Sequence, residues 1–163
     1  GRGAAGRGIV VVDGGSDCGS RRRLADAVHA SGGKAVGVYP REFGELLHPG
    51  LTESILVDSL AVRKQEMIRR SDAAIVLPGS FGTFDELFDL LALQKLKIVR
   101  RFPIVLLNLK GFYDPLFQLI RRSVDEGFTK PRHAALLQCA ATPDEALAMI
   151  CRDEALERES GAL

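Results

Sequence analysis

The segment Pro78-Gly79-Ser80-Phe81-Gly82-Thr83-Phe84-Asp85-Glu86 combines glycines, hydroxyls and carboxylates at a spacing that suits anion chemistry. It follows a short apolar run and precedes a helical pattern, so we expect it to end a buried strand and begin a helix. The unpaired N–H groups and the dipole of such a helix N-terminus favour a bound anion. The Thr83 hydroxyl could then contact a phosphate, and Glu86 could act on the group that the phosphate carries.

The spacing of Thr83 and Glu86 also has a structural interpretation. In a capping box, Thr83 would cap the helix and Glu86 would bond back to the N-cap amide. Spacing alone leaves both interpretations open and favours the capping box.

A second group of candidate residues, Arg63-Lys64-Gln65-Glu66-Met67, lies upstream in a stretch with helical spacing. Arg63 offers a fixed fork of donors that could hold a substrate or orient a carboxylate. Taken alone, Arg63 and Lys64 are more simply interpreted as solvated charges on a helix face. The histidines have no partner that spacing identifies, so structural or solvent-facing roles are expected for His29, His48 and His133.

The elements that would position these residues alternate along the chain. Short apolar runs predict strands over residues 9–12, 34–39, 54–57, 73–77, 103–107 and 136–139. Helical spacing predicts helices over residues 20–30, 59–70, 83–97, 114–126 and 143–157. The alternation predicts an α/β fold, a doubly wound (Rossmann-like) parallel sheet with helices on both faces, as a single domain over 1–163. Ligands bind such sheets beyond the carboxyl ends of the strands, which singles out the segments after Val12, Val57 and Leu77.

Composition excludes several classes of function. The 163 residues carry 22 Lys+Arg and 21 Asp+Glu, a net charge of +1, so no global charge attracts nucleic acid or a membrane surface. An odd number of widely spaced cysteines (Cys18, Cys139 and Cys151) predicts neither a disulfide framework nor a metal site. No apolar run approaches the roughly 18 residues that cross a bilayer. A cytoplasmic location is expected, with an organellar one left open.

The two motifs together resemble the LOG (Lonely Guy) family of phosphoribohydrolases, long labelled lysine decarboxylases. The family pattern is Pro-Gly-Gly-x-Gly-Thr-x-x-Glu, preceded by a helix with Arg-Lys-x-x-Met. The resemblance continues through Phe88-Asp89, Pro103-Ile104-Val105-Leu106-Leu107-Asn108, Gly111-Phe112-Tyr113-Asp114-Pro115-Leu116 and Val124-Asp125-Glu126-Gly127-Phe128, and so covers nearly the whole chain.

The resemblance implies hydrolysis of the N-glycosidic bond of a purine nucleoside 5′-monophosphate, with N6-modified adenine as one candidate base. The products are the free base and ribose 5-phosphate, and neither cofactor nor metal is implied. By similarity, Glu86 is the catalytic carboxylate and Arg63 the second catalytic residue. The implied substrate- and phosphate-binding residues are Gly14, Gly15, Gly19, Lys64, Gly79, Ser80, Gly82 and Thr83. A homodimer is also implied, with the apolar helix near Phe84 to Leu96 as a candidate interface.

Three departures from the family pattern keep a second function open. Ser80 replaces a glycine, which would cost roughly 1–2 kcal/mol if that position needed a positive φ. The segment Arg21-Arg22-Arg23 replaces an apolar pair and a glycine, and could meet an anion, a partner or only solvent. By the same resemblance, the chain is expected to lack the family's first strand and helix. The alternative is a catalytically impaired paralogue that serves as a nucleotide-binding or structural subunit of a larger complex. Amino-acid decarboxylation needs a pyridoxal-bearing lysine in a larger framework, which no motif indicates.

Overall fold

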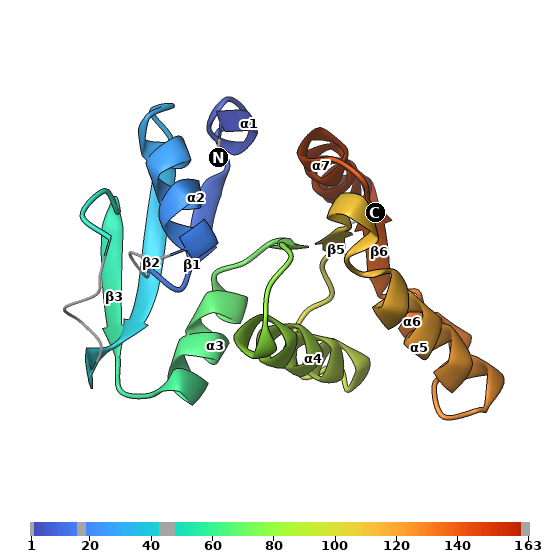
Figure 1. Ribbon diagram of the computed structural model, residues 1–163. Helices are drawn as coiled ribbons and strands as arrows, with labels where there is room; N and C mark the ends of the chain where they lie inside the picture. Colours follow the sequence, from blue (N-terminus) through green and yellow to red (C-terminus); the bar gives the residue numbers. More distant parts are fainter. Residues whose placement is uncertain (1, 16–18, 43–47, 161–163) are drawn as a thin grey trace. The chain divides into compact units, whose positions relative to one another are not determined.

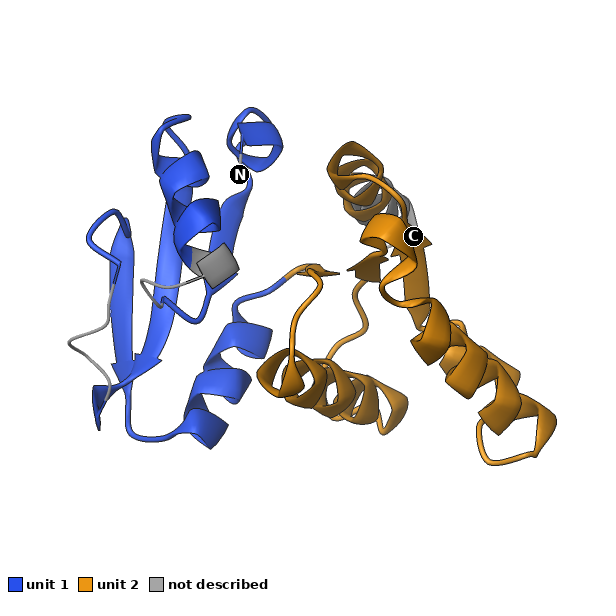
Figure 2. Cartoon of the chain, viewed as in Figure 1, with its two compact units in different colours: residues 1–71 blue, residues 72–163 orange. Residues whose placement is uncertain are grey.

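The computed structural model describes residues 2–15, 19–42 and 48–160. For residues 19–21 and 152–160 it describes the backbone only. The chain forms two compact units, Gly1–Ser71 and Asp72–Leu163 (Figure 2). Each unit is built from one three-stranded parallel sheet and its helices (Figure 1).

The first unit contains the sheet β1-β2-β3. Its elements are α1 (Arg2–Ala5), β1 (Val10–Asp13), α2 (Gly19–His29), β2 (Lys34–Pro40), β3 (Glu53–Val57) and α3 (Leu60–Arg69). Val12 lies opposite Val36, and Val38 lies opposite Ile55. The central strand β2 is buried along residues 35–40, because α2 and α3 both pack against it.

The second unit contains the sheet β4-β5-β6. Its elements are β4 (Ala74–Val76), α4 (Phe81–Lys95), β5 (Ile104–Leu107), the 3-10 turn η2 (Leu109–Gly111), α5 (Asp114–Asp125), α6 (Pro131–Ala134), β6 (Leu137–Ala140) and α7 (Pro143–Ser160). The central strand β5 is entirely buried, as expected for a continuous apolar run in a parallel sheet. α7 packs against β5 and β6.

Parallel pairing brings the loops at the carboxyl ends of the strands to one edge of each sheet. In the first unit, the turns after Asp13 and after Val57 share that edge. In the second unit, the edge carries the segment after Val76, the segment after Leu107 and the turn after Ala140. Each candidate motif therefore lies at or just beyond the ligand-binding edge of its own sheet.

The structure confirms the predicted parallel α/β fold, and every predicted strand and helix occurs within three residues of its predicted ends. The short helical segments α1, η2 and α6 were not predicted, because three or four residues show no periodicity. The single-domain boundary over residues 1–163 stays a prediction. Within the described residues, no helix is both long and apolar enough to span a bilayer.

Candidate functional site

The helix after β4 begins earlier than its sequence pattern indicates. α4 starts at Phe81, with Ser80 as N-cap, and the Ser80 side chain makes no capping hydrogen bond. The Thr83 N–H donates to the Ser80 carbonyl oxygen at 2.9 Å, so Thr83 lies inside the first helical turn. Thr83 is therefore not the N-cap, and the capping-box interpretation is wrong.

The backbone at Ser80 accommodates a side chain without strain. Its φ of −112° and ψ of −158° are extended, a conformation open to any residue. The expected cost of a non-glycine residue at this position does not arise. The replacement of the family's glycine by Ser80 is thus no argument against an intact loop.

Gly79 is required by the close approach of Thr83. A Cβ atom on Gly79 would lie 2.8 Å from the Thr83 Cβ and would collide with the Thr83 hydroxyl oxygen. Gly82 differs, because a Cβ there would meet nothing within 4 Å. The loop therefore folds back over the Thr83 side chain, which holds the hydroxyl against the loop backbone at the start of the helix.

This contrast gives a matched pair of variants. We expect Gly79→Ala to lower the free energy of unfolding by about 1–3 kcal/mol, because the new methyl group overpacks the loop against Thr83. Gly82→Ala should leave it unchanged or raise it by up to about 1 kcal/mol, since alanine favours a helix more than glycine does. Urea midpoints of the two variants measure the difference. Equal midpoints would show that Thr83 does not constrain Gly79.

Glu86 lies on the same face of α4 as Thr83, three residues further along the helix. It is half-buried, next to Leu87 and one turn before Leu90, and both leucines are buried. The carboxylate thus belongs to the edge of the core-facing stripe, within one turn of the Thr83 hydroxyl. Such a position suits a carboxylate that acts on a ligand held at the helix N-terminus.

In the first unit, the glycine turn after β1 is fixed by local hydrogen bonds. The Gly15 N–H donates to the Asp13 carboxylate at 2.5 Å, and the Gly15 carbonyl accepts from the His48 N–H at 3.0 Å. Gly14 and Gly15 are buried, and Gly15 has a φ of +65°, a conformation that favours glycine. Gly19 is the first residue of α2. Residues 16–18, including Cys18, lie outside the described part of the chain.

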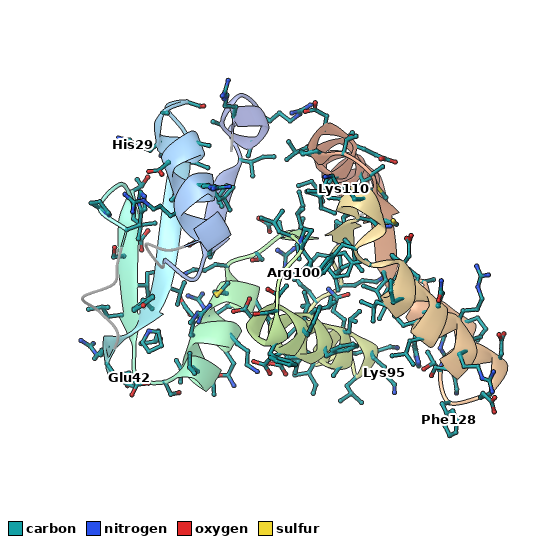
Figure 3. The ribbon with its side chains drawn as sticks, in the orientation of Figure 1. His29, Glu42, Lys95, Arg100, Lys110 and Phe128 are labelled. Carbon is teal, nitrogen blue, oxygen red and sulfur yellow. The ribbon has the colours of Figure 1, made fainter. Side chains whose placement is uncertain are left out.

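His48 is a buried residue that sequence reasoning left without a partner. Its Nδ1 accepts from the Gly50 N–H at 3.0 Å, so the neutral ring carries its proton on Nε2 and donates to Asp26 at 3.0 Å. The structural role predicted for His48 is confirmed. His29 is solvent-facing, as expected (Figure 3). His133 is half-buried, and burial and the nearby Arg132 lower its pKa.

Arg63 is buried on α3, with only 8% of its surface exposed. The interpretation of Arg63 as a solvated surface charge is therefore wrong. The helix that carries it is capped by Ser59, whose hydroxyl accepts from the Val62 N–H at 3.3 Å. Lys64 is half-buried on the same helix. Because burial of a guanidinium is costly, it marks a position where the charge has a specific task.

Glu66, within the same motif, is held by two arginines of its own helix. The Arg69 side chain donates to both carboxylate oxygens, at 2.9 and 2.7 Å, and Arg70 Nε donates at 2.5 Å. The hydrogen bonds from Arg69 and then Arg70 lower the pKa of Glu66 to about 2. Glu66 thus stabilises the end of α3.

We expect Glu66→Gln to lower the free energy of unfolding at neutral pH by about 0.5–1 kcal/mol, because such helix-surface ion pairs contribute little each. A lowered carboxyl pKa stabilises the fold above the unfolded-state value of 4.5, and this contribution is lost as the pH falls towards about 2. The difference between wild type and variant should therefore shrink between pH 5 and pH 2. Denaturant titrations across that range measure it, and a constant difference would contradict the ion-pair assignment.

The predicted site residues divide into two groups by the unit that carries them. Gly79, Ser80, Gly82, Thr83 and Glu86 lie within one loop and the first two turns of α4. The second group is Gly14, Gly15, Gly19, Arg63 and Lys64, on the turn after β1, the start of α2 and α3. That the two groups meet in one site stays a prediction. In the described ranges, no three His, Cys, Asp or Glu side chains gather as ligands for a metal ion.

The arginine segment is described only in part. Arg22 and Arg23 are exposed on α2, and the Arg21 side chain lies outside the described set. Tyr113 lies in a run that resembles the family, but the resemblance implies no role for it. Its hydroxyl donates to the Leu77 carbonyl at 2.6 Å, just before the candidate loop. The sequence signal that could have pointed to Tyr113 is its place in the run Gly111-Phe112-Tyr113-Asp114.

Comparison with known proteins supports the resemblance. Residues 22–150 match the family model described as "Possible lysine decarboxylase". An Arabidopsis thaliana cytokinin riboside 5′-monophosphate phosphoribohydrolase, LOG2, is 35% identical over 146 residues, 88% of this chain and 68% of that protein. The chain belongs to the LOG family. A second LOG protein, the rice "Probable cytokinin riboside 5′-monophosphate phosphoribohydrolase LOGL5" (Oryza sativa subsp. japonica), is 40% identical over 143 residues. That match covers 86% of this chain but 58% of the rice protein, so the chain spans little more than half of this relative.

Solved structures show that the LOG chain shares its fold with more distant proteins. The molybdenum cofactor binding protein of Rippkaea orientalis aligns with a TM-score of 0.72 at 19% identity, over 93% of this chain and 81% of that one. The molybdenum cofactor carrier protein of Chlamydomonas reinhardtii aligns with a TM-score of 0.68 at 22% identity, over 94% and 82%. At such identities the likeness establishes the fold alone.

Proposed function

We propose that this LOG protein hydrolyses the N-glycosidic bond of a purine nucleoside 5′-monophosphate. The observation that carries the proposal is the start of α4, where the Gly79-Ser80 loop packs against Thr83 and leads into Thr83 and Glu86 on one helix face. The curated relatives are named phosphoribohydrolases, which is the same chemistry. N6-modified adenine is the candidate base, because those relatives are named for cytokinin nucleotides.

The proposed mechanism begins with the 5′-phosphate at the N-terminus of α4. The N–H groups of its first turn and the helix dipole favour the dianion, and the Thr83 hydroxyl donates a further hydrogen bond. As the C1′–N bond breaks, positive charge develops on the ribose, and the Glu86 carboxylate stabilises it. Water attacks C1′ and gives it a hydroxyl group, the electron pair of the broken bond passes to the base nitrogen, and that nitrogen takes up the proton that the water loses. Arg63 would hold the substrate or orient Glu86.

Base release tests the proposal directly. The protein is incubated with a panel of nucleoside 5′-monophosphates, including AMP and N6-isopentenyl-AMP, and the products are separated by chromatography. We expect free base and ribose 5-phosphate in equal amounts from at least one purine nucleotide, and none from the nucleoside without phosphate. Failure of every nucleotide in the panel to release base would overturn the proposal.

The second candidate function, a paralogue that binds nucleotides without turnover, rests on the exposed arginines of α2. The replacement of a glycine by Ser80, one of its other two arguments, no longer supports it, because Ser80 is unstrained. Nucleotide binding without base release, or incorporation into a larger complex, would favour this candidate.

We further propose a homodimer, formed through α4, in a cytoplasmic protein. Phe81, Phe88 and Leu96 are exposed at 89%, 47% and 64% and follow one another along the solvent-facing side of the helix and its end. Leu87 of the same helix is buried and faces the core. Light scattering should give twice the chain mass, and Phe88→Glu should reduce it to that of one chain. A monomeric wild type would contradict the dimer.

A further inference from the structure

The second unit contains a partly buried hydrogen-bond network that ends at the candidate phosphate loop. Tyr113 is 1% exposed, and its hydroxyl donates to the Leu77 carbonyl oxygen at 2.6 Å. Leu77 follows the last residue of β4 and immediately precedes Pro78 and Gly79. The bond therefore fixes the backbone at the point where the chain leaves the sheet and enters the loop.

The Tyr113 backbone is itself held from the end of the neighbouring strand β5. Asn108, directly after β5, accepts from the Tyr113 N–H through its amide oxygen at 2.7 Å. Its amide nitrogen donates to the Asp114 carboxylate at 2.7 Å, and its backbone N–H donates to the Ala140 carbonyl at 2.8 Å. Asn108 thus links the ends of β5 and β6 to Tyr113 and Asp114. Satisfied side-chain networks of this kind rigidify the groups they join.

The backbone between Asn108 and Tyr113 is shaped for this arrangement. Gly111 has a φ of +73°, and a Cβ there would lie 2.5 Å from an Asp114 carboxylate oxygen. Phe112 packs edge-on against the Tyr113 ring, with centroids 5.0 Å apart at 90°. Lys110, labelled in Figure 3, also has a positive φ, of 53°. Two consecutive left-handed residues therefore turn the chain so that the tyrosine points back towards β4.

We propose that the Tyr113 hydroxyl, oriented by Asn108 and Asp114, is a positioning group for the phosphate-binding loop. It contacts the Leu77 carbonyl rather than substrate, and acts by holding the segment from Leu77 to Ser80 in the register at which the N–H groups of α4 face a phosphate. The inference rests on the proposed function for its link to catalysis. Its local part, the fixing of the loop, stands on the hydrogen bonds alone.

Tyr113→Phe isolates the hydroxyl, because the ring and its contact with Phe112 remain. In the ligand-free protein, amide hydrogen exchange of the peptide spanning residues 77–84 should accelerate about tenfold, while that of residues 87–95 should not change. In base release, the KM for the nucleoside monophosphate should rise about tenfold with kcat altered less than threefold, since phosphate contacts are made equally before and at the transition state. Asn108→Ala should shift both readouts in the same direction.

Tyr39→Phe is the matched control, because Tyr39 is also buried but lies on β2 in the other unit. It should change neither the exchange of residues 77–84 nor the KM. Unchanged exchange in Tyr113→Phe would overturn the inference whatever the activity. Faster exchange with an unchanged KM, in an active wild type, would also overturn it. If the wild type releases no base, the proposed function fails, and the exchange measurement alone still decides whether Tyr113 holds the loop.

Discussion

Replacing Glu86 by glutamine should reduce base release about 10³-fold, while the nucleotide still binds. The substitution preserves the size of the side chain and removes its negative charge. It should therefore remove stabilisation of the developing ribose cation, an effect expressed only in the transition state. Carboxylates that act on the reacting group contribute factors of about 10²–10⁴. Chromatographic assay of free base measures kcat, and calorimetric titration with AMP measures the dissociation constant, which should change less than threefold.

Asp85→Asn is the matched control for this prediction. Asp85 is the adjacent carboxylate of α4 and is exposed, whereas Glu86 is half-buried on the core-facing side. The control loses the same charge from the same helical turn, so it also reports any effect on the helix dipole. Its rate should stay within about threefold of wild type. A Glu86→Gln variant as active as Asp85→Asn would remove Glu86 from the reaction.

The fold was largely predictable because its strands are short apolar runs with clear stops. β5, with four consecutive buried residues, needs no partner to be recognised as a strand of a parallel sheet. Helix starts were less predictable, since they depend on where backbone donors find acceptors. At α4 the Ser80 carbonyl accepts from both Thr83 and Phe84, so the helix begins at Phe81, although the spacing of Thr83 and Glu86 matches a capping box.

The candidate site was predictable where a local run of residues carries it. The loop from Pro78 to Glu86 is continuous in sequence, and its expected position at the end of a strand is the observed one. Two other features depend on contacts between distant residues, and no spacing rule reveals them. The burial of Arg63 and the bond from Tyr113 to Leu77, 36 residues apart, are of this kind. Sequence resemblance identified both segments, but only the structure shows that Arg63 is buried and that Tyr113 bonds to Leu77.

Local spacing and family resemblance favour different interpretations of the same residues. For Thr83 and Glu86, local spacing favoured a capping box, and the resemblance favoured a ligand site. The helix start at Phe81 removes the capping box. For Arg63, spacing favoured a solvated charge, and burial removes that interpretation. A capping box or a solvated surface charge would have explained these residues without any function. The structure excludes both of these roles.

Arg63 therefore carries the second large expected effect. Arg63→Ala should lower kcat/KM about 10²-fold or more, because a buried guanidinium that contacts substrate or a catalytic carboxylate supplies charge-assisted hydrogen bonds. Arg63→Lys keeps the charge but loses the planar fork, so it should recover only part of the activity. Added guanidinium ion should restore some base release to Arg63→Ala and none to Arg63→Lys, whose ammonium occupies the space.

Arg69→Ala is the control from the same helix, since Arg69 is exposed and paired with Glu66. It should weaken the helix end slightly and leave kcat/KM within about threefold of wild type. Because Arg63 is buried, thermal unfolding of each variant must accompany the kinetics, and a variant that melts below the assay temperature reports stability alone. In a variant that stays folded, guanidinium rescue shows that the lost side chain acts in the reaction. Rescue requires a folded protein with an intact cavity in place of the side chain. Full activity in a folded Arg63→Ala variant would show that this buried cation serves the fold, and would leave Glu86 as the one side chain proposed to act on the ribose.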